Sequence, residues 1–373
     1  MIEVRAPGKL FIAGEYAVVE PGEPAVLVAV DRFITLRLTE SFEEGRVRSE
    51  EYGRSPLVWV RDPESGEIVR EHEPVDYVFA AIHAVEQLRA ELGIRPRYFD
   101  LEIRSELDDV SGRKLGLGSS AAVTVAVIAA LDEFYGLSLT RAERFRLSLL
   151  ATIEIAPNAS GGDLAASTFG GWIRYVSPDR GALHEARAEH GVARALQAAP
   201  WQRTELERLP HPSRLRLLTG WTGIPASTER LVSGIARASS TSGPTRLAAQ
   251  AGEHRPLVPF VDESRVCVEA VANSLRTELP GALAAIRRAR RLMRNLGLAS
   301  GIEIETPRLC ALCDIAERNG AAAKPSGAGG GDCGIVLAPG EADPAGILSE
   351  WERNEIVPLS LSVHAPSGGT DGI

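Results

Sequence analysis

Hydrophobic residues along the chain follow two periods, one typical of strands and one typical of helices. In Ile34-Thr-Leu-Arg-Leu38 and Asp100-Leu-Glu-Ile-Arg104 apolar and polar residues alternate, which indicates strands with one buried face. This alternation, together with short apolar runs bounded by turn residues, predicts these strands: 2–6, 10–13, 25–30, 33–39, 57–60, 100–104, 172–176, 214–219, 334–337 and 357–363.

Helical spacing is clearest over 76–92, where apolar residues recur every three or four positions and Gly93 follows the end. Thr140 and Glu143 form a capping-box pattern, which predicts a helix to about residue 155. The almost wholly apolar run within 119–135 is long, opens on Ser-Ser and is followed by Gly136, which favours a buried helix. Further helices are predicted near 227–238, 257–277 and 281–296, and from Thr306-Pro307 onward.

Strands and helices do not alternate strictly, so the predicted fold class is mixed α/β (α+β) with β-hairpins. The 373 residues predict two or three domains. The stretch 178–212 is rich in Ala, Arg, Glu and Pro, and we interpret it as a domain junction.

Charge and apolar content exclude several classes of function. The net charge of −9 argues against nonspecific binding to nucleic acid or to acidic membranes. No apolar run is long enough for a membrane span and the N-terminus lacks the shape of a signal peptide, so we expect a cytoplasmic protein. Cys310 and Cys313 have helical spacing and apolar neighbours, which favours two buried thiols over a zinc site. The arginine-rich stretch 287–294 is interpreted as a solvated helix face.

Lysine is nearly absent, since only Lys9, Lys114 and Lys324 stand among 41 basic Lys and Arg residues. A lysine ammonium is compact, whereas an arginine guanidinium is a wide planar fork. The three lysines therefore mark positions at which we expect arginine not to fit. Each lies in or beside a segment rich in glycine or small residues.

Three such segments predict chemistry. In Pro7-Gly-Lys-Leu-Phe-Ile-Ala-Gly-Glu-Tyr16 two glycines frame an apolar strand that begins at Lys9; the alternative is a hairpin with a solvated lysine. Gly112-Arg-Lys-Leu-Gly-Leu-Gly-Ser-Ser-Ala-Ala122 leads into a helix, whose free N–H groups suit an anion; the alternative is an ordinary serine cap. The loose GxGxxA match in this segment is weak evidence for a dinucleotide site.

The third segment is Lys324-Pro-Ser-Gly-Ala-Gly-Gly-Gly-Asp-Cys-Gly-Ile-Val-Leu337. Glycine costs conformational entropy on folding, so a cluster this dense just before a strand suits close wrapping of a ligand. A flexible linker is the alternative, although linkers seldom run directly into a strand.

Together, PGKLFIAGEY, GLGSSAAV and KPSGAGGGDCG resemble, in this order, the three motifs of the GHMP kinases. The resemblance implies an N-terminal domain (1–190) similar to ribosomal protein S5 domain 2 and a ferredoxin-like C-terminal domain (191–373) that contains the glycine-rich loop 324–334. It also implies that ATP lies between the two domains, with Mg²⁺ as cofactor.

Within the family, Asn158-Ala-Ser-Gly-Gly-Asp-Leu-Ala-Ala-Ser167 and Gly220-Trp-Thr-Gly-Ile-Pro-Ala-Ser-Thr228 resemble the phosphomevalonate kinases, as does Glu15-Tyr16 where mevalonate kinases have Glu-His. The implied reaction is ATP-dependent conversion of 5-phosphomevalonate to 5-diphosphomevalonate. The alternatives are a mevalonate kinase or another small-molecule GHMP kinase and, remotely, a non-catalytic ligand sensor of this fold. The expected partner is the small-molecule substrate, with no nucleic acid or membrane, and the expected state is a monomer or homodimer.

The resemblance also implies roles for individual residues. Lys9 and Asp163 are the predicted catalytic residues, with Asp163 orienting Lys9 or assisting with Mg²⁺ rather than acting as a base. Ser120 is the predicted metal ligand, and neither Thr152 nor Glu154 is a clean second ligand. The predicted ATP contacts are Lys114, Gly116, Leu117, Gly118, Ser119, Ser120 and Ala121. The predicted substrate contacts are Glu15, Ser160, Gly161, Ser227, Ser326, Gly327, Ala328 and Gly329.

Overall fold

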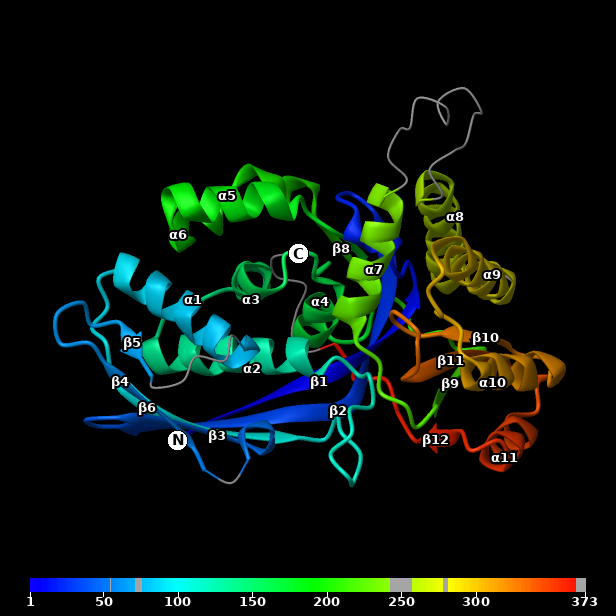
Figure 1. Ribbon diagram of the computed structural model, residues 1–373, viewed down its shortest axis with the longest axis horizontal. Coiled ribbons are helices and arrows are strands. Elements are labelled where there is room, and N and C mark those ends of the chain that lie inside the picture. Colours follow the sequence, from blue (N-terminus) through cyan, green and yellow to red (C-terminus); the bar gives the residue numbers. More distant parts are fainter. Residues whose placement is uncertain (54, 71–75, 242–256, 278–280, 367–373) are drawn as a thin grey trace.

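The computed structural model describes residues 1–53, 55–70, 76–241, 257–277 and 281–366. Two β-sheets, each covered by helices, form the molecule, and the ends of α2 and α7 lie between them (Figure 1). The confirmed fold class is thus mixed α/β, with antiparallel pairing everywhere except between β3 and β6.

The larger sheet has the strand order β5-β4-β3-β6-β2-β7-β8, with β1 paired to β2. Its centre is β2, an 18-residue strand that pairs with β1 along its length, with β6 at one end and with β7 at the other. The strands are β1 (Ile2–Ala13), β2 (Pro24–Ser41), β3 (Gly45–Ser49), β4 (Leu57–Arg61), β5 (Ile68–Val69), β6 (Tyr98–Ser105), β7 (Trp172–Val176) and β8 (Glu205–Leu209).

Helices α1 to α4 lie over one face of this sheet, and α5 and α6 pack outside them (Figure 1). Because α2 is apolar on nearly every side, it is buried between the sheet and the other helices. The helices are α1 (Tyr77–Glu91), α2 (Ser119–Tyr135), α3 (Arg141–Ile155), α4 (Gly162–Phe169), α5 (Arg180–His190) and α6 (Val192–Ala195). Short 3₁₀ turns cover Ala17–Val19, Glu50–Tyr52 and Ala199–Arg203.

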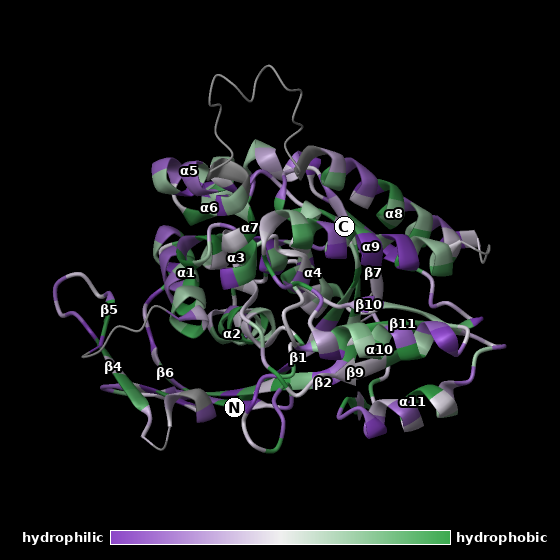
Figure 2. Ribbon diagram, turned by 45° about the vertical axis from the view of Figure 1, so that its right-hand side comes forward, coloured by the Kyte–Doolittle hydropathy of each residue, from purple (hydrophilic) through white to green (hydrophobic). Residues whose placement is uncertain are grey.

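The smaller sheet has the order β10-β11-β9-β12, with strands β9 (Leu215–Trp221), β10 (Ala322–Pro325), β11 (Cys333–Pro339) and β12 (Val357–Leu359). Its helices are α7 (Thr228–Thr241), α8 (Leu257–Thr277), α9 (Ala282–Ser300), α10 (Pro307–Arg318) and α11 (Pro344–Arg353). Figure 2 shows the mixed polar and apolar colouring of α8 and α9, as expected of amphipathic helices. Both pack on β10 or on the neighbouring end of the larger sheet, so one hydrophobic core continues from one sheet to the other.

Several boundaries differ from the prediction. The strands predicted at 2–6 and 10–13 are one strand, β1, with an irregularity in pairing between Pro7 and Gly8. The stretch 178–212, interpreted as a domain junction, contains regular elements that the sequence did not indicate: α5, α6 and β8, which pairs with β7. The strand predicted to 363 ends at Leu359, since the chain leaves the smaller sheet and returns to β2 through a single bridge at Val363. Periodicity missed the short elements β3, β5, α4, β10 and α11.

Two side-chain expectations also need correction. Cys313 is fully buried as predicted, but Cys310 is only partly buried, beside Asp314. The arginine-rich face of α9 is not wholly solvated, because Arg290 is buried and pairs with Glu305 at 2.7 Å. The same guanidinium also contacts Asp314 at 2.6 Å and so ties α9 to α10. The division of the chain between residues 190 and 191 stays a prediction.

Candidate active site

The first two motifs are joined at the backbone of Lys9. Its N–H donates to the carbonyl of Leu117 at 2.8 Å, and the neighbouring Gly8 leaves no room for a side chain between Leu107 and Leu117. The lysine side chain then runs along Gly118, where an added methyl group would lie 2.9 Å from Lys9 Cε. The glycine at position 118 therefore lets a cation lie directly against the start of α2.

The start of α2 has no side-chain cap. Gly118 occupies the cap position with a left-handed φ of 83°, and Ser119 is the first helical residue, so the alternative of an ordinary serine cap is wrong. In the described part of the chain, the hydroxyls of Ser119 and Ser120 make no hydrogen bond. The first turn therefore offers backbone N–H groups, the positive end of the helix dipole and two hydroxyls to an anion.

The third motif closes over the second. The Sγ of Cys333 contacts the carbonyl of Leu115 at 3.0 Å, and the Asp332 side chain covers Gly116 so closely that a methyl group there would lie 2.5 Å from its Cβ. These contacts place the glycine-rich loop beside the second motif, in the loop that precedes α2. Residues more than 200 positions apart in the sequence are therefore in direct contact.

The third motif is also bound to the first. Ser326 Oγ accepts the N–H of Phe11 at 2.9 Å and donates to its carbonyl at 3.0 Å, while Tyr16 donates to the carbonyl of Ala328. Lys324, which has no exposed surface, forms an ion pair with the buried Glu15 and donates to the carbonyl of Pro325 at 2.6 Å. The predicted substrate contacts Glu15 and Ser326 therefore have partners inside the protein, and their contact with substrate stays a prediction.

Asp163 lies in the first turn of α4, which packs against β1. A methyl group added to the preceding residue, Gly162, would lie 3.4 Å from the ring of Phe11, and the Lys9 ammonium lies 5.3 Å from the centre of that same ring. The start of α4, which carries Asp163, and the side chain of Lys9 thus both lie near the ring of Phe11. Gly161 caps α4 with a left-handed φ of 84°.

Two other predicted contacts flank these residues. Ser160 is buried. Its hydroxyl accepts the N–H of Gly162 at 3.3 Å, and its carbonyl accepts the hydroxyl of Tyr175 at 2.8 Å. Ser227 is exposed at the start of α7, where its hydroxyl accepts the N–H of Arg230 at 3.4 Å. The helix-capping interpretation of Ser227 is therefore supported, and its contact with substrate stays a prediction.

Electrostatics single out Lys9. Lys9 is 7% exposed, yet in the part of the chain that the structure describes its ammonium forms no ion pair and no hydrogen bond. Its neighbours are the Phe11 ring and Asp332, whose carboxyl pKa is raised by burial and lowered in part by the nearby Lys9 charge. Charged groups are seldom buried without a partner, because desolvation is costly. A buried ammonium against the start of a helix is a site prepared for an anion.

A cavity of about 120 Å³ lies beside Ser119 and Ser120 at the start of α2. Lys114, Ser119 and Ser120 line one end, and residues of β2, β6 and α1 line the other: Ile34, Ile103, Ser105, Tyr77 and Val78. Sequence reasoning did not find these wall residues, because no local pattern distinguishes them from the other residues of their strands and helix.

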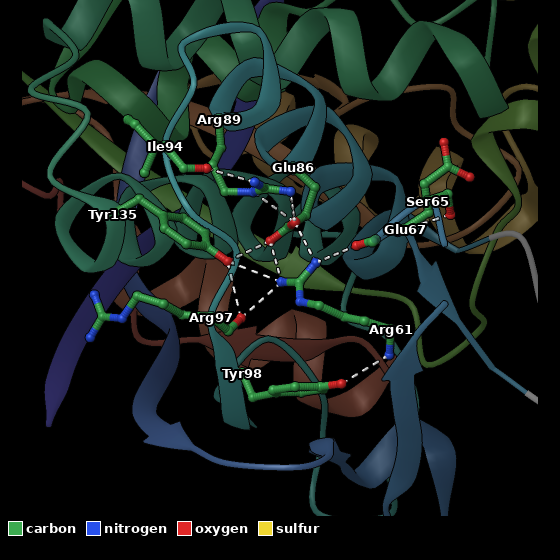
Figure 3. Close-up of polar contacts among 10 residues, drawn as sticks. Arg61, Ser65, Glu67, Glu86, Arg89, Ile94, Arg97, Tyr98 and Tyr135 are labelled. Atoms are coloured by element: carbon green, nitrogen blue, oxygen red, sulfur yellow. Dashed lines mark hydrogen bonds and ion pairs between the residues drawn. The ribbon is translucent and has the colours of Figure 1, made fainter. Parts of the chain in front are cut away.

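A larger cavity, about 520 Å³, follows α1 on the side of β5 and contains none of the motif residues. Its charged wall is paired within the protein, as Figure 3 shows: Arg61 binds both oxygens of Glu86 at 2.8 and 3.0 Å, and Arg89 binds the same carboxylate at 2.8 Å. Burial tends to raise the pKa of Glu86, but the hydrogen bonds from Arg61 and Tyr135 outweigh it and lower that pKa. Glu154, which faces this cavity, pairs with Arg187 at 3.3 Å.

Both halves of the chain match family models, which are described as GHMP kinases N terminal domain over residues 76–171 and GHMP kinases C terminal over residues 281–356. A phosphomevalonate kinase of Streptomyces sp. (strain CL190) is 44% identical over 372 residues, 96% of this chain and 96% of the relative. The chain belongs to the GHMP kinases. The resemblance seen in the three motifs is therefore confirmed.

Two further relatives of this GHMP kinase chain differ in their stated activity. A mevalonate kinase of Thermococcus gammatolerans is 29% identical, over 90% of this chain and 88% of the relative. A solved structure of Streptococcus pneumoniae phosphomevalonate kinase in complex with phosphomevalonate and AMPPNP has a TM-score of 0.81 and 26% identity, over 97% of this chain and all of that one. The described part of this chain has no helix long and apolar enough to cross a bilayer.

Proposed function

We propose that this GHMP kinase transfers the γ-phosphoryl group of ATP to the 5-phosphate of phosphomevalonate, forming 5-diphosphomevalonate. The observation that carries the reaction class is the buried Lys9 ammonium on Gly118 at the start of α2, which forms no ion pair with any residue that the structure describes. The choice of acceptor is supported by the near-full-length similarity to a phosphomevalonate kinase.

The acceptor needs little help in losing a proton. A phosphate monoester has a second pKa near 6 and is mostly dianionic at neutral pH. The obstacle is repulsion between two anionic phosphates, so positioning and positive charge contribute most of the catalysis. Lys9 would contact the transferring group and the acceptor phosphate. Asp163, in the first turn of α4, would orient that lysine instead of removing a proton.

The donor phosphates would occupy the start of α2. Backbone N–H groups of the turn from Gly116 to Ala121 would bind them, and Lys114, which lines the neighbouring cavity, would add charge. The 120 Å³ cavity would hold the nucleoside, since its apolar wall suits a flat base and Ser105 and Tyr77 supply polar groups.

The residues at the start of α2 also fit Mg²⁺. The Ser120 hydroxyl has no hydrogen bond in the described part of the chain. The residues that the structure describes contain no group of three or more His, Cys, Asp or Glu side chains that could hold a metal ion by itself. Mg²⁺ is usually held by one or two protein oxygens together with substrate phosphates, as this donor set allows. When bound, the ion would supply charge neutralisation at the phosphates. Ser120 is the proposed ligand, and Asp163 on α4 is the carboxylate proposed to assist it.

A substrate panel tests the proposal. ADP release is measured with ATP, Mg²⁺ and, separately, phosphomevalonate, mevalonate, homoserine and galactose, and Lys9→Met serves as the matched inactive variant. We expect turnover with phosphomevalonate alone. Turnover with mevalonate but not with its phosphate would assign the chain to the mevalonate kinases instead. ATP binding without turnover on any substrate would favour a non-catalytic ligand sensor.

A further inference from the structure

Asp332 is the acidic residue of the glycine-rich loop, and neither its motif nor the proposed reaction gives it a role. It has a left-handed φ of 51°, a conformation that is uncommon for a residue other than glycine, with Asn and Asp among the exceptions. Strained backbone of this kind persists only where surrounding contacts impose it, and it is concentrated at functional sites.

The surrounding contacts come from the segment 222–226. The Asp332 N–H donates to the carbonyl of Ile224 at 2.7 Å, and its carbonyl accepts the N–H of Thr222 at 3.0 Å and the hydroxyl of Thr222 at 3.1 Å. The carboxylate adds a fourth bond, since Oδ1 accepts the N–H of Ala226 at 3.0 Å. Asp332 therefore holds the residues immediately before Ser227 and α7.

The other side of the same carboxylate lies on the phosphate loop. A methyl group on Gly116 would stand 2.8 Å from Asp332 Oδ2, so the side chain and this glycine are in direct contact. Burial raises the pKa of Asp332, against the Ala226 hydrogen bond and the nearby Lys9, which lower it. One side chain thus contacts the donor-phosphate loop and the beginning of α7 and lies close to the Lys9 cation.

We propose that Asp332 is a positioning residue: by accepting the Ala226 N–H while packed on Gly116, its carboxylate fixes the Ser227 end of α7 relative to the phosphate loop. This inference rests on the proposed function, because Ser227 is there a contact of the acceptor substrate. The two loops are far apart along the chain, so tertiary contacts must set their separation within the tolerance that phosphoryl transfer demands. The exposed Arg113 also joins them, through the carbonyl of Gly223 at 3.3 Å, and the buried Asp332 carboxylate adds a shorter contact.

Two substitutions separate the carboxylate from the backbone. Asp332→Gly removes the side chain but adopts φ of 51° without strain, so the backbone bonds to Thr222 and Ile224 remain. Asp332→Asn keeps an oxygen acceptor for the Ala226 N–H and tolerates the same φ. We expect kcat to fall roughly 10²-fold in Asp332→Gly and to stay within about tenfold of wild type in Asp332→Asn.

The control is Asp343→Gly. Asp343 also accepts a backbone N–H at the start of a helix, that of Gly346 at 3.0 Å, but it does so at α11, on elements that carry none of the site residues. This variant is expected to lower Tm and leave kcat unchanged. All variants are measured at saturating ATP and phosphomevalonate, with Tm recorded beside kcat.

A second measurement does not depend on fold stability. Ser227→Ala is combined with Asp332→Gly, and the two kcat losses are compared with that of the double variant. If Asp332 acts by placing Ser227, the double loss is clearly smaller than the product of the single losses. Near wild-type kcat in Asp332→Gly, equal damage in Asp332→Asn, or fully multiplicative losses would overturn the inference. An inactive wild-type protein would instead refute the proposed function.

Discussion

Replacing Lys9 by arginine keeps the charge and changes only its shape. The lysine stem is confined, because its Cε, Cγ and Cδ lie 2.9, 3.2 and 3.5 Å from the point where a Gly118 side chain would begin. The ammonium lies 5.3 Å from the centre of the Phe11 ring. A guanidinium would have to occupy this space as a wide fork at the end of the same confined stem.

The size of the effect follows from that geometry. We expect the backbone to move little, since β1 is paired with β2 along its length and the Lys9 N–H bonds the Leu117 carbonyl at 2.8 Å. The charge must therefore move outward by roughly 1 Å, and a misplacement of about 1 Å costs on the order of 10²-fold in rate. This equals roughly 2.7 kcal/mol of transition-state stabilisation.

The assay is kcat by coupled ADP release at saturating ATP and phosphomevalonate, with Tm as the check on folding. Lys114→Arg is the matched control. Lys114 is exposed and lines the 120 Å³ cavity, where a phosphate can accept both N–H groups of a guanidinium, so we expect a loss of kcat below about tenfold. If Lys9→Arg retains nearly full kcat, Lys9 does not act at the transferring group, and the argument from scarce lysines fails.

Other consequences can be measured independently. Lys324→Met leaves the Glu15 carboxylate buried without its partner, so unfolding free energy in urea should fall by about 3–5 kcal/mol, and adding Glu15→Gln should restore part of it; equal stability in the single variant would contradict the buried pair. Asp163→Asn should lower kcat by about 10²-fold or less, because the acceptor dianion needs no base. A loss far above 10⁴-fold with unchanged ATP affinity would show that Asp163 acts as a general base or binds the metal ion. The lowered pKa of Glu86 contributes stability above its unfolded pKa that is lost as pH falls through the folded pKa, so the wild type should lose more stability than Glu86→Gln on acidification below about pH 4, and parallel urea midpoints would refute this.

Local sequence features predicted the long elements because their signals do not depend on distant residues. The capping box at Thr140 and Glu143 forms as expected, with the Thr140 N–H 2.9 Å from the Glu143 carboxylate. The apolar helix from 119 to 135 has the predicted bounds. The scarcity of lysine drew attention to Lys9 and Lys324, which are both buried, and the expectation that arginine does not fit there stays a prediction.

Sequence reasoning failed where short segments are stabilised by partners far along the chain. Strand β8 lies in a stretch of junction-like composition, and its place comes from pairing with β7. Arg290 resembles its four basic neighbours on α9, and only the approach of α10 and Glu305 shows that it is buried. The pairing of Glu15 with Lys324 joins residues more than 300 positions apart, and no local pattern indicates it.

The sequence by itself determined the family, because three glycine-rich motifs with a lysine in or beside each have a chemical meaning that needs no coordinates. Only the tertiary structure decided how these motifs meet: Lys9 against Gly118, Asp332 on Gly116, and Ser326 on Phe11. The physical reason is that helix and turn preferences act over a few residues. The relative placement of loops 100 to 300 residues apart depends on the packing of two sheets around one shared core.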